Sequence, residues 1–311
     1  MSMLRPSHAA FGADPSTRCS LTFDGFSRSQ GLEATGRETH ATSMLRDVRY
    51  RQDWLRRSDS SIFTRIQPQD LQQAASMLEK LAKYDTPTIC NVIELFDVRP
   101  RTAGYMNDTI KACFPKMPPM VGYAVTSTFR SMSPPRGGDV YASMSDQVSA
   151  YAALPGPAVM VYQDLDVPII SATFGEVMCT VYKSFGAKGL ITSGAGRDLD
   201  QVERIGFPCF TSGAICSHGY CHTLHVNVPV TVGGICIYPG DLIHGDVNGV
   251  TTIPPEIASE IPDACEELAA AESVILDYCR GGNITAAGLA EARKECQDRM
   301  KQMGLRLRKK R

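Results

Sequence analysis

Several features that identify particular protein classes are missing from this sequence of 311 residues. No apolar run reaches the roughly 18 residues that a membrane-spanning helix needs, so no membrane partner is expected. Lysines and arginines number 32 against 33 aspartates and glutamates, and this balance argues against a nucleic-acid partner. The glycine fingerprint of dinucleotide sites, the phosphate-binding loop and the nucleophile elbow of serine hydrolases are also missing.

Cysteine is plentiful, but its placement argues against a disulfide scaffold. The eleven cysteines are scattered through apparent core segments, as Cys90 and Cys179 show, which favours free thiols in a reducing, cytoplasmic environment. Residues 1–67 contain no apolar stretch typical of a secretory signal, and we expect them to form a disordered leader or N-terminal extension. Their arginines and serines leave organelle targeting as an alternative.

The remaining residues, 68–311, are expected to form one α/β domain. From Pro155 onward, strands alternate with helices of about ten residues, which predicts parallel strands joined by right-handed crossovers. The expected helices are 70–81, broken by Thr86-Pro87, then 88–96, 139–153, 176–185, 197–205, 255–279 and 286–303, the last ended by Gly304. The expected strands are 121–126, 158–162, 168–174, 189–192, 208–212, 224–232, 235–238, 242–245 and 250–253.

Two short segments carry the residues best suited to chemistry. They are Phe174-Gly175-Glu176-Val177-Met178 and Gly194-Ala195-Gly196-Arg197-Asp198, and each follows an apolar run and opens a helix-like stretch. Twenty residues, one strand-helix-strand passage, separate Glu176 from Arg197. We therefore expect the two turns to lie side by side at one edge of the sheet, where ligands bind in such folds.

These turns combine groups that suit a small anionic substrate and a divalent metal. The N–H groups of Val177 and Met178 at a helix start, together with the Arg197 guanidinium, can bind one carboxylate. Glu176 and Asp198 offer the hard oxygen ligands that Mg²⁺ or Mn²⁺ prefers, with water completing the coordination.

Each acid also has a purely structural interpretation. Glu176, Asp198 and Asp200 all fall in the first turn of a predicted helix, where acids are common because they complement the helix dipole. The glycines at both turns and the arginine directly before Asp198 favour the functional interpretation.

Two further possibilities remain open. His244, near Asp241 and Asp246, either lies beside the substrate or is a strand-end histidine whose hydrogen bonds go to the backbone. Soft ligands are also concentrated in one segment, which leaves a structural zinc site as an alternative, although their spacing matches no familiar zinc signature: Cys216, His218, Cys221, His222 and His225.

The stretch from Val121 to about Pro254 resembles the RraA-like family. That family includes 4-hydroxy-4-methyl-2-oxoglutarate aldolases, oxaloacetate decarboxylases and a regulator of ribonuclease activity. The resemblance implies a single α/β domain of RraA-like layered β/β/α, swivelling-domain-like architecture with flanking helices. The matching pieces occur in the family's order: Val121-Gly122-Tyr123-Ala124-Val125-Thr126, Phe174-Gly175-Glu176, Gly194-Ala195-Gly196-Arg197-Asp198, Gly206-Phe207-Pro208 and Pro239-Gly240-Asp241 followed by Asn248-Gly249-Val250.

The resemblance also implies residue roles and an assembly. Asp198 would hold the metal directly or through water, assisted by Glu176, and Arg197 would bind the keto oxygen and carboxylate of the substrate. Gly175 and the amides of Val177 and Met178 would receive that carboxylate. Members of the family form trimers or hexamers in which a neighbour's C-terminal helix adds an acid to the site, here Glu272 or Glu267.

The activity implied is Mg²⁺- or Mn²⁺-dependent cleavage of a C–C bond in a 2-oxo dicarboxylate, giving pyruvate. Decarboxylation of oxaloacetate is slightly favoured over retro-aldol cleavage, because neither turn contains a histidine that could serve as base. The sequence departs from the family's aldolases at Glu176, where aspartate is common, and at Gln201, where an acid is frequent. The alternative is a non-catalytic regulatory protein on the same fold.

Overall fold

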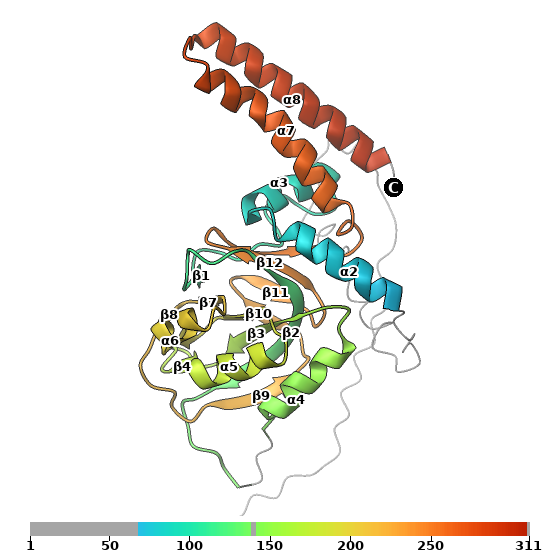
Figure 1. The fold of residues 1–311 in the computed structure, drawn as a ribbon. Coiled ribbons are helices and arrows are strands. Elements are labelled where there is room, and N and C mark those ends of the chain that lie inside the picture. Colours follow the sequence, from blue (N-terminus) through green and yellow to red (C-terminus); the bar gives the residue numbers. More distant parts are fainter. Residues whose placement is uncertain (1–67, 138–140, 310–311) are drawn as a thin grey trace, which may run out of the picture. The chain divides into compact units, whose positions relative to one another are not determined.

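A mixed sheet of eight strands organises the part of the chain that the structure describes, residues 68–137 and 141–309 of a computed structural model (Figure 1). The expected leader, 1–67, lies outside the described residues. The helices are α2 (Pro68–Leu81), α3 (Thr86–Phe96), α4 (Met144–Ser149), the 3₁₀ helix η1 (Ala150–Ala153), α5 (Glu176–Ser184), α6 (Leu199–Arg204), α7 (Ile261–Arg280) and α8 (Ala286–Lys309). The strands are β1 (Lys111–Ala112), β2 (Met120–Arg130), β3 (Ala158–Asp164), β4 (Ala172–Phe174), β5 (Gly189–Thr192), β6 (Ala195–Gly196), β7 (Cys209–Thr211), β8 (Gly213–Ala214), β9 (His222–Val226), β10 (Val230–Val232), β11 (Ile235–Ile237), β12 (Leu242–Asp246) and β13 (Gly249–Ile253).

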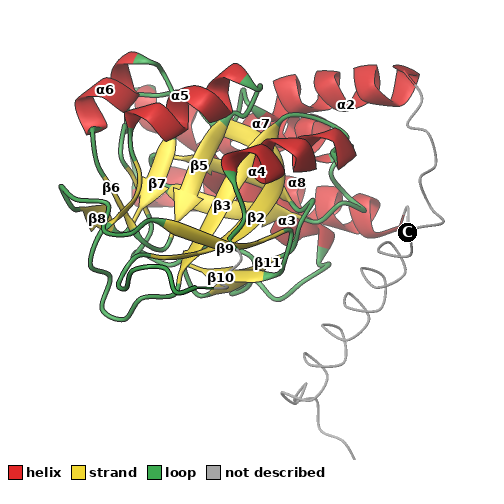
Figure 2. Cartoon of the chain, turned by 90° about the horizontal axis from the view of Figure 1, so that it is seen from below, coloured by secondary structure: helices red, strands yellow, loops and turns green. Residues whose placement is uncertain are grey.

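The sheet joins a parallel half to an antiparallel half. Its order is β1-β7-β5-β3-β2-β12-β13, and β9 pairs with β2 beyond the end of β12. Strands β3, β5 and β7 run parallel, as the alternating pattern predicts; β2 joins them in parallel, and β12 and β13 run antiparallel. The predicted strand 168–174 is shortened to β4 and lies outside this sheet. The short strands β4, β6 and β8 form a separate parallel sheet, and β10 pairs with β11. Helices α5 and α6 lie together on one side of the main sheet (Figure 2).

Both faces of the central strands are buried, which explains their nearly continuous apolar sequence. Val125 and Met160 face a core shared with α5 and α6, whereas their neighbours Ala124 and Val161 face a core closed by the β10–β11 pair. This alternation follows from the two-residue period of a strand.

The helices at the two ends of the domain share a third core. Leu81 of α2, Ile93 of α3, Leu268 of α7 and Leu307 of α8 are all buried in it. Figure 1 shows α7 and α8 as a long hairpin next to α3. None of the described helices is long and apolar enough to cross a membrane.

Several predicted boundaries are wrong: the helix expected from 255 begins at Ile261, and the strand expected to end at 126 continues to Arg130. Four others have a local reason. Thr86-Pro87 begins α3 rather than preceding it, because Asp85 caps the helix by accepting from the Thr88 N–H at 2.9 Å and a proline is tolerated in the first turn. The helix expected over 139–153 begins only at Met144, after a capping box formed by Ser143.

The other two differences concern a strand that is divided and a helix that continues beyond its predicted end. The strand expected over 224–232 is divided into β9 and β10, with Asn227 between them in a left-handed conformation at φ 56°. Gly304 does not end the last helix, because Met303 and Leu307 on either side are buried in the helical core and α8 continues to Lys309.

Candidate active site

The three-stranded sheet places the two turns that carry the predicted site residues. Strand β4 pairs in parallel with β6, so that Phe174 lies opposite Gly196. The N–H of Arg197 also donates to the Phe174 carbonyl at 3.1 Å. The structure therefore brings together the two turns that the sequence spacing pairs.

The carboxylate of Asp198 links these turns. Its Oδ2 accepts a hydrogen bond from the Glu176 N–H at 3.1 Å and lies 3.7 Å from Arg197 Nε. Asp198 adopts a left-handed conformation with φ 54°, and its side chain makes no capping bond to its own helix, α6. Asp198 is the N-cap residue of α6 by position, but its carboxylate does not cap that helix and instead accepts from an N–H at the start of α5.

Gly175 is required by the close approach of the turns. A Cβ at this position would lie 2.5 Å from Asp198 Oδ2 and 3.1 Å from Arg197 Nε. The first distance is shorter than van der Waals contact permits, so any side chain at 175 would displace the carboxylate.

Glu176 and Asp200 present their carboxylates to solvent. Both residues are exposed, and the Glu176 carboxylate takes part in no hydrogen bond or ion pair with other described residues. Nowhere in 68–137 or 141–309 do three His, Cys, Asp or Glu side chains gather as a metal site would require. Among the described residues, the two turns offer a metal the carboxylates of Glu176 and Asp198, which fall short of such a cluster.

A pocket of about 380 Å³ opens beside the turns. Gly175 and Arg197 contribute to one wall, together with Val177 and Met178 in the first turn of α5, whose N–H groups have no carbonyl partner within the helix. Arg197 is about one-third exposed, which leaves its guanidinium accessible to a ligand. Most of the other lining side chains are aromatic or apolar and come from β2, β4, α4, α5 and β9, including Phe129, Met144, Phe174 and Tyr182.

A buried polar network underlies this pocket. The side chain of Gln147 donates to Ser127 Oγ at 3.0 Å and to Tyr162 OH at 2.5 Å, and it accepts from Tyr182 OH. The two phenol oxygens are 2.6 Å apart. Burial raises the pKa of both phenols far above the ordinary value, so both stay protonated. The network therefore fixes α4 against the sheet and carries no charge.

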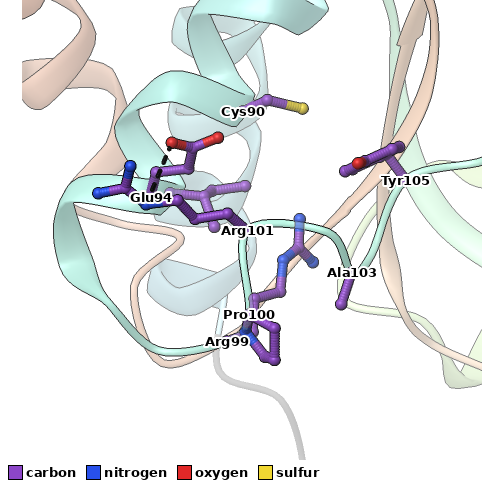
Figure 3. A pocket seen from close by; sticks show the side chains of 8 residues that line it. Cys90, Glu94, Arg99, Pro100, Arg101, Ala103 and Tyr105 are labelled. Carbon is purple, nitrogen blue, oxygen red and sulfur yellow. Dashed lines mark ion pairs between the residues drawn. The ribbon is translucent and has the colours of Figure 1, made fainter.

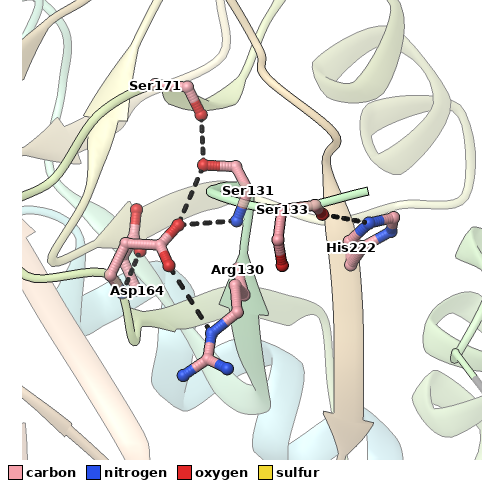
Figure 4. Close-up of polar contacts among 7 residues, drawn as sticks. Arg130, Ser131, Ser133, Asp164, Ser171 and His222 are labelled. Carbon is pink, nitrogen blue, oxygen red and sulfur yellow. Dashed lines mark hydrogen bonds and ion pairs between the residues drawn. The ribbon is translucent and has the colours of Figure 1, made fainter. Parts of the chain in front are cut away.

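Two stacked rings form another wall of the pocket. Tyr141 stacks on His222 with centroids 4.2 Å apart and planes 9° from parallel. The Nε2 of His222 lies 3.2 Å from the Ser133 carbonyl (Figure 4). The backbone bridge between Ala142 and Thr223 adds to these contacts, so Tyr141 and Ala142, just before α4, are held against β9.

A second polar cluster lies at the end of β2. The carboxylate of Asp166 accepts from the Ser131 N–H at 2.6 Å and from Ser131 Oγ at 3.0 Å, and it pairs with Arg130 (Figure 4). Neighbouring Asp164 has a buried Oδ2 with no hydrogen-bond partner in the described chain. Burial raises the pKa of Asp164 to about 6.

The structure settles the two possibilities left open by the sequence. His244 is fully buried, 3.0 Å from Thr86 Oγ1 and 3.2 Å from the Leu81 carbonyl, so it is a satisfied core histidine. Burial lowers its pKa and keeps it neutral. The residues Cys216 to His225 do not assemble a metal site; instead His218, Cys221 and His222 line the pocket.

A second hollow lies beside α3 and holds no more than a water-sized molecule, with a volume of about 20 Å³ (Figure 3). Its Arg99 is held by the Thr252 carbonyl at 3.0 Å and by Thr251 Oγ1 at 3.1 Å. This arginine therefore serves the packing of α3 against β13.

Sequence reasoning missed the wall and floor of the pocket. Gln147 is an uncharged polar residue that is fully buried on a short helix, and only its place within an otherwise apolar helix face could have signalled a role. The stacking of Tyr141 on His222 joins residues some eighty positions apart, which no local pattern reveals.

Comparison with known proteins gives a consistent picture of the fold. A family model described as "RraA-like: Aldolase/RraA" matches residues 86–252, more than half of the chain. A solved structure of an uncharacterized protein from Pseudomonas syringae pv. tomato superposes with a TM-score of 0.56 at 22% identity, over 71% of this chain and 93% of that one. The structure of Streptomyces coelicolor RraAS2, described as an unusual member of the RNase ES inhibitor RraA protein family, gives a TM-score of 0.52 at 21% identity, over 64% and 94%. The predicted RraA-like α/β fold class is confirmed.

Curated relatives are similar over a shorter stretch. A Halalkalibacterium halodurans protein named "Putative 4-hydroxy-4-methyl-2-oxoglutarate aldolase" is 35% identical over 105 residues, which is 33% of this chain and 49% of that protein. The chain spans about half the length of the first curated relatives it matches.

Proposed function

Because the chain belongs to the RraA-like family, we propose that it is a divalent-metal-dependent lyase that cleaves a C–C bond of a 2-oxo acid and releases pyruvate. One observation carries this proposal. The Asp198 carboxylate and the Arg197 guanidinium are held together at the start of α5, beside a pocket. The name given to the Halalkalibacterium halodurans relative supports the same class of reaction.

The residues of this chain bind the 2-oxo acid from two sides. The free N–H groups of Val177 and Met178 and the positive end of the α5 dipole receive the substrate carboxylate. Arg197 donates to the same carboxylate or to the adjacent keto oxygen, since its planar fork suits both. The substrate carbon chain then extends into the pocket.

The donor set at the turns fits Mg²⁺ or Mn²⁺. Mg²⁺ is usually held by one or two carboxylates and keeps several waters. Asp198 supplies one such ligand at the turn, and the solvent-facing carboxylate of Glu176 on the neighbouring turn is available as a second. The chemistry that the ion supplies when bound is Lewis-acid stabilisation of the charge that develops on the keto oxygen.

Arg197 contributes to the chemical step by opposing the same developing charge, because it is fixed in place by Asp198 before the reaction begins. Decarboxylation of oxaloacetate needs no base, since carbon dioxide leaves unaided. Retro-aldol cleavage needs a group that removes the proton from the C4 hydroxyl, and neither turn provides a histidine for it. Decarboxylation is therefore the simpler activity for this site.

The proposal includes a homotrimer or hexamer in which a neighbour's C-terminal helix contributes an acid. Of the two candidates, Glu267 is paired within its own chain with Arg306, both of whose terminal nitrogens contact the carboxylate. Glu272 is half-buried and forms no such pair in the described chain, so it is the better candidate.

Pyruvate release from oxaloacetate tests the function. The purified protein with Mg²⁺ should form pyruvate well above the rate of Mg²⁺ alone, followed by a coupled lactate dehydrogenase assay. Arg197→Ala and Asp198→Ala should each lower kcat/KM by roughly 100-fold or more. Background rates with folded protein on oxaloacetate and on a panel of 4-hydroxy-2-oxo acids would instead favour a non-catalytic regulator.

A further inference from the structure

The pocket has one side suited to an anion and a larger side that is not. Among the described residues that line it, Arg197 is the only one with a permanent positive charge, and no lysine is present. Arg197 and the first turn of α5 are already assigned to the 2-oxo acid group. A second carboxylate on the substrate would therefore find no cation of this chain in the rest of the pocket.

The polar groups of the floor are also unavailable. Both amide hydrogens of Gln147 are directed to Ser127 and Tyr162, and its oxygen accepts from Tyr182. Because these groups satisfy one another and are fully buried, a carboxylate placed against them would lose its water without gaining a donor.

The two imidazoles of the pocket are turned toward backbone carbonyls. His222 Nε2 lies 3.2 Å from the Ser133 carbonyl and His218 Nδ1 lies 2.8 Å from the Gly219 carbonyl. A ring nitrogen next to a carbonyl carries the proton, so in a neutral imidazole the remaining nitrogen is an acceptor. The nitrogens that face Ser133 and Gly219 are therefore used by backbone carbonyls and not by a ligand.

Aromatic and apolar surface makes up most of the remainder, which also includes Thr173, Thr223 and Cys221. Phe129 and Phe174 are almost fully buried behind the pocket, Met144 lies at its α4 side, and Tyr141 and His222 stack into a flat wall. The flat faces of these rings favour contact with a ring or a branched apolar group of a ligand. The volume of about 380 Å³ falls within the range of roughly 300–1,000 Å³ typical of pockets for small organic ligands, and it exceeds what a four-carbon acid fills.

We propose that the substrate is a 2-oxo monocarboxylate whose far end is apolar or aromatic, a 4-hydroxy-2-oxo acid with such a group on C4, rather than a 2-oxo dicarboxylate. This inference rests on the proposed function and narrows it. In the reaction, the C4 hydroxyl gives its proton to a water molecule in the site, since neither turn provides a histidine. The C3–C4 bond breaks, its electron pair goes to C3, and C3 takes a proton from water. The products are pyruvate and an apolar aldehyde or ketone, and no oxidant or reductant is needed.

The test uses two unreactive acids that share one head group. 2-Oxo-4-phenylbutanoate and 2-oxoglutarate differ only in a phenyl group against a carboxylate at C4, and neither carries the hydroxyl that cleavage requires. In calorimetric titrations of the full chain with Mg²⁺, we expect the phenyl acid to bind at least tenfold more tightly. Equal affinities, tighter binding of 2-oxoglutarate, or no binding of either acid would overturn the inference.

A charge placed in the apolar wall provides the matched variant. Met144→Arg should reverse the preference toward 2-oxoglutarate, because Met144 lines the pocket and is 42% exposed, so the fold tolerates the change. Met132→Arg adds the same charge at a residue that is 49% exposed and outside the lining, and should leave the preference unchanged. A preference that Met144→Arg does not move would contradict the assignment of this wall.

Turnover separates this inference from the proposed function. Pyruvate release from oxaloacetate reports the lyase activity alone. If that activity is present while 4-hydroxy-2-oxoglutarate is cleaved faster than 4-hydroxy-2-oxo-4-phenylbutanoate, the proposed function stands and the inference fails. The expected result is a kcat/KM at least tenfold higher for the phenyl substrate.

Discussion

The N–H of Glu176 donates to the carboxylate of Asp198 at 3.1 Å, across a separation of 22 residues. This bond connects the start of α5 to the turn before α6, and Arg197 lies 3.7 Å from the same oxygen. The carboxylate therefore orients the guanidinium and at the same time fixes the helix start that is proposed to receive the substrate. Changes that move this carboxylate should affect binding and chemistry together.

Replacing Gly175 with alanine tests this arrangement without removing any functional group. The new Cβ would lie 2.5 Å from Asp198 Oδ2, so the carboxylate must shift. We expect kcat/KM for pyruvate release to fall roughly 10- to 100-fold while the melting temperature changes little, since displacements of about 1 Å in a site have such effects. Gly213→Ala, where a Cβ would meet nothing within 4 Å, is the control and should retain full activity. Full activity of Gly175→Ala would show that the position of Asp198 is unimportant.

Metal affinity should distinguish the two carboxylates from nearby acids that only complement a helix dipole. We expect Asp198→Asn to weaken Mn²⁺ binding roughly 10- to 100-fold, and Glu176→Gln to weaken it less, because Glu176 is exposed and its carboxylate has no partner in the described chain to hold it in place. Asp200→Asn, in the first turn of α6, should leave binding unchanged. Electron paramagnetic resonance of free Mn²⁺ gives the dissociation constants. Equal effects of all three changes would assign the metal to another place.

The buried acid Asp164 should make the protein less stable at neutral pH than in mild acid. Burial raises its pKa from 3.8 to about 6, so the folded state holds a proton that the unfolded state has released between these pH values. Stability is therefore lost as pH rises through this window, and most of the loss has occurred once the pH exceeds about 6.

Asp164→Asn removes that ionisation and keeps an oxygen that can accept from the Asp166 N–H. In urea unfolding, we expect the variant to be more stable than the natural chain at pH 7.5 and equal to it near pH 3.5. The exposed Asp200→Asn should show no such pH-dependent difference. A variant that is less stable at every pH would mean that the Asp164 carboxylate has a partner.

Much of the fold follows from the sequence because local rules determine it. The alternation of strands and helices after Pro155 predicts the parallel half of the sheet, and the turn glycines predict where Arg197 and Asp198 lie. The sequence predicts the start of α3 two residues too late, because proline usually breaks a helix, whereas the Asp85 cap makes Pro87 a first-turn residue.

Features made by distant residues were beyond such rules. The pocket wall depends on Tyr141 meeting His222, and its floor on Gln147 meeting Tyr182. Neither pair has a spacing that a helix or strand period would mark. The two carboxylates predicted as ligands were identified by residue type, but only the structure shows that Asp198 faces the other turn while Glu176 faces solvent.

Two glycines of α8 should respond in opposite ways to alanine, although both are in one helix. Glycine within a helix is destabilising by roughly 0.5–1 kcal/mol relative to alanine, so a replacement that fits should stabilise the protein by about that amount. At Gly304 a Cβ would meet only the end of the flexible Arg308 side chain, at 3.1 Å. At Gly288 it would lie 2.7 Å from Tyr278 Cζ, and that ring is held by the Thr285 N–H at 2.8 Å.

We therefore expect Gly304→Ala to raise the free energy of unfolding by about 0.5 kcal/mol and Gly288→Ala to lower it, because the Tyr278 ring must leave the contact that joins α7 to α8. Urea denaturation of both variants, with pyruvate release as a check on the distant site, measures the difference. Since Gly304 does not line the pocket, activity should stay unchanged in Gly304→Ala. Destabilisation by Gly304→Ala would show that the close packing around Met303 and Leu307 leaves no room for a Cβ at position 304.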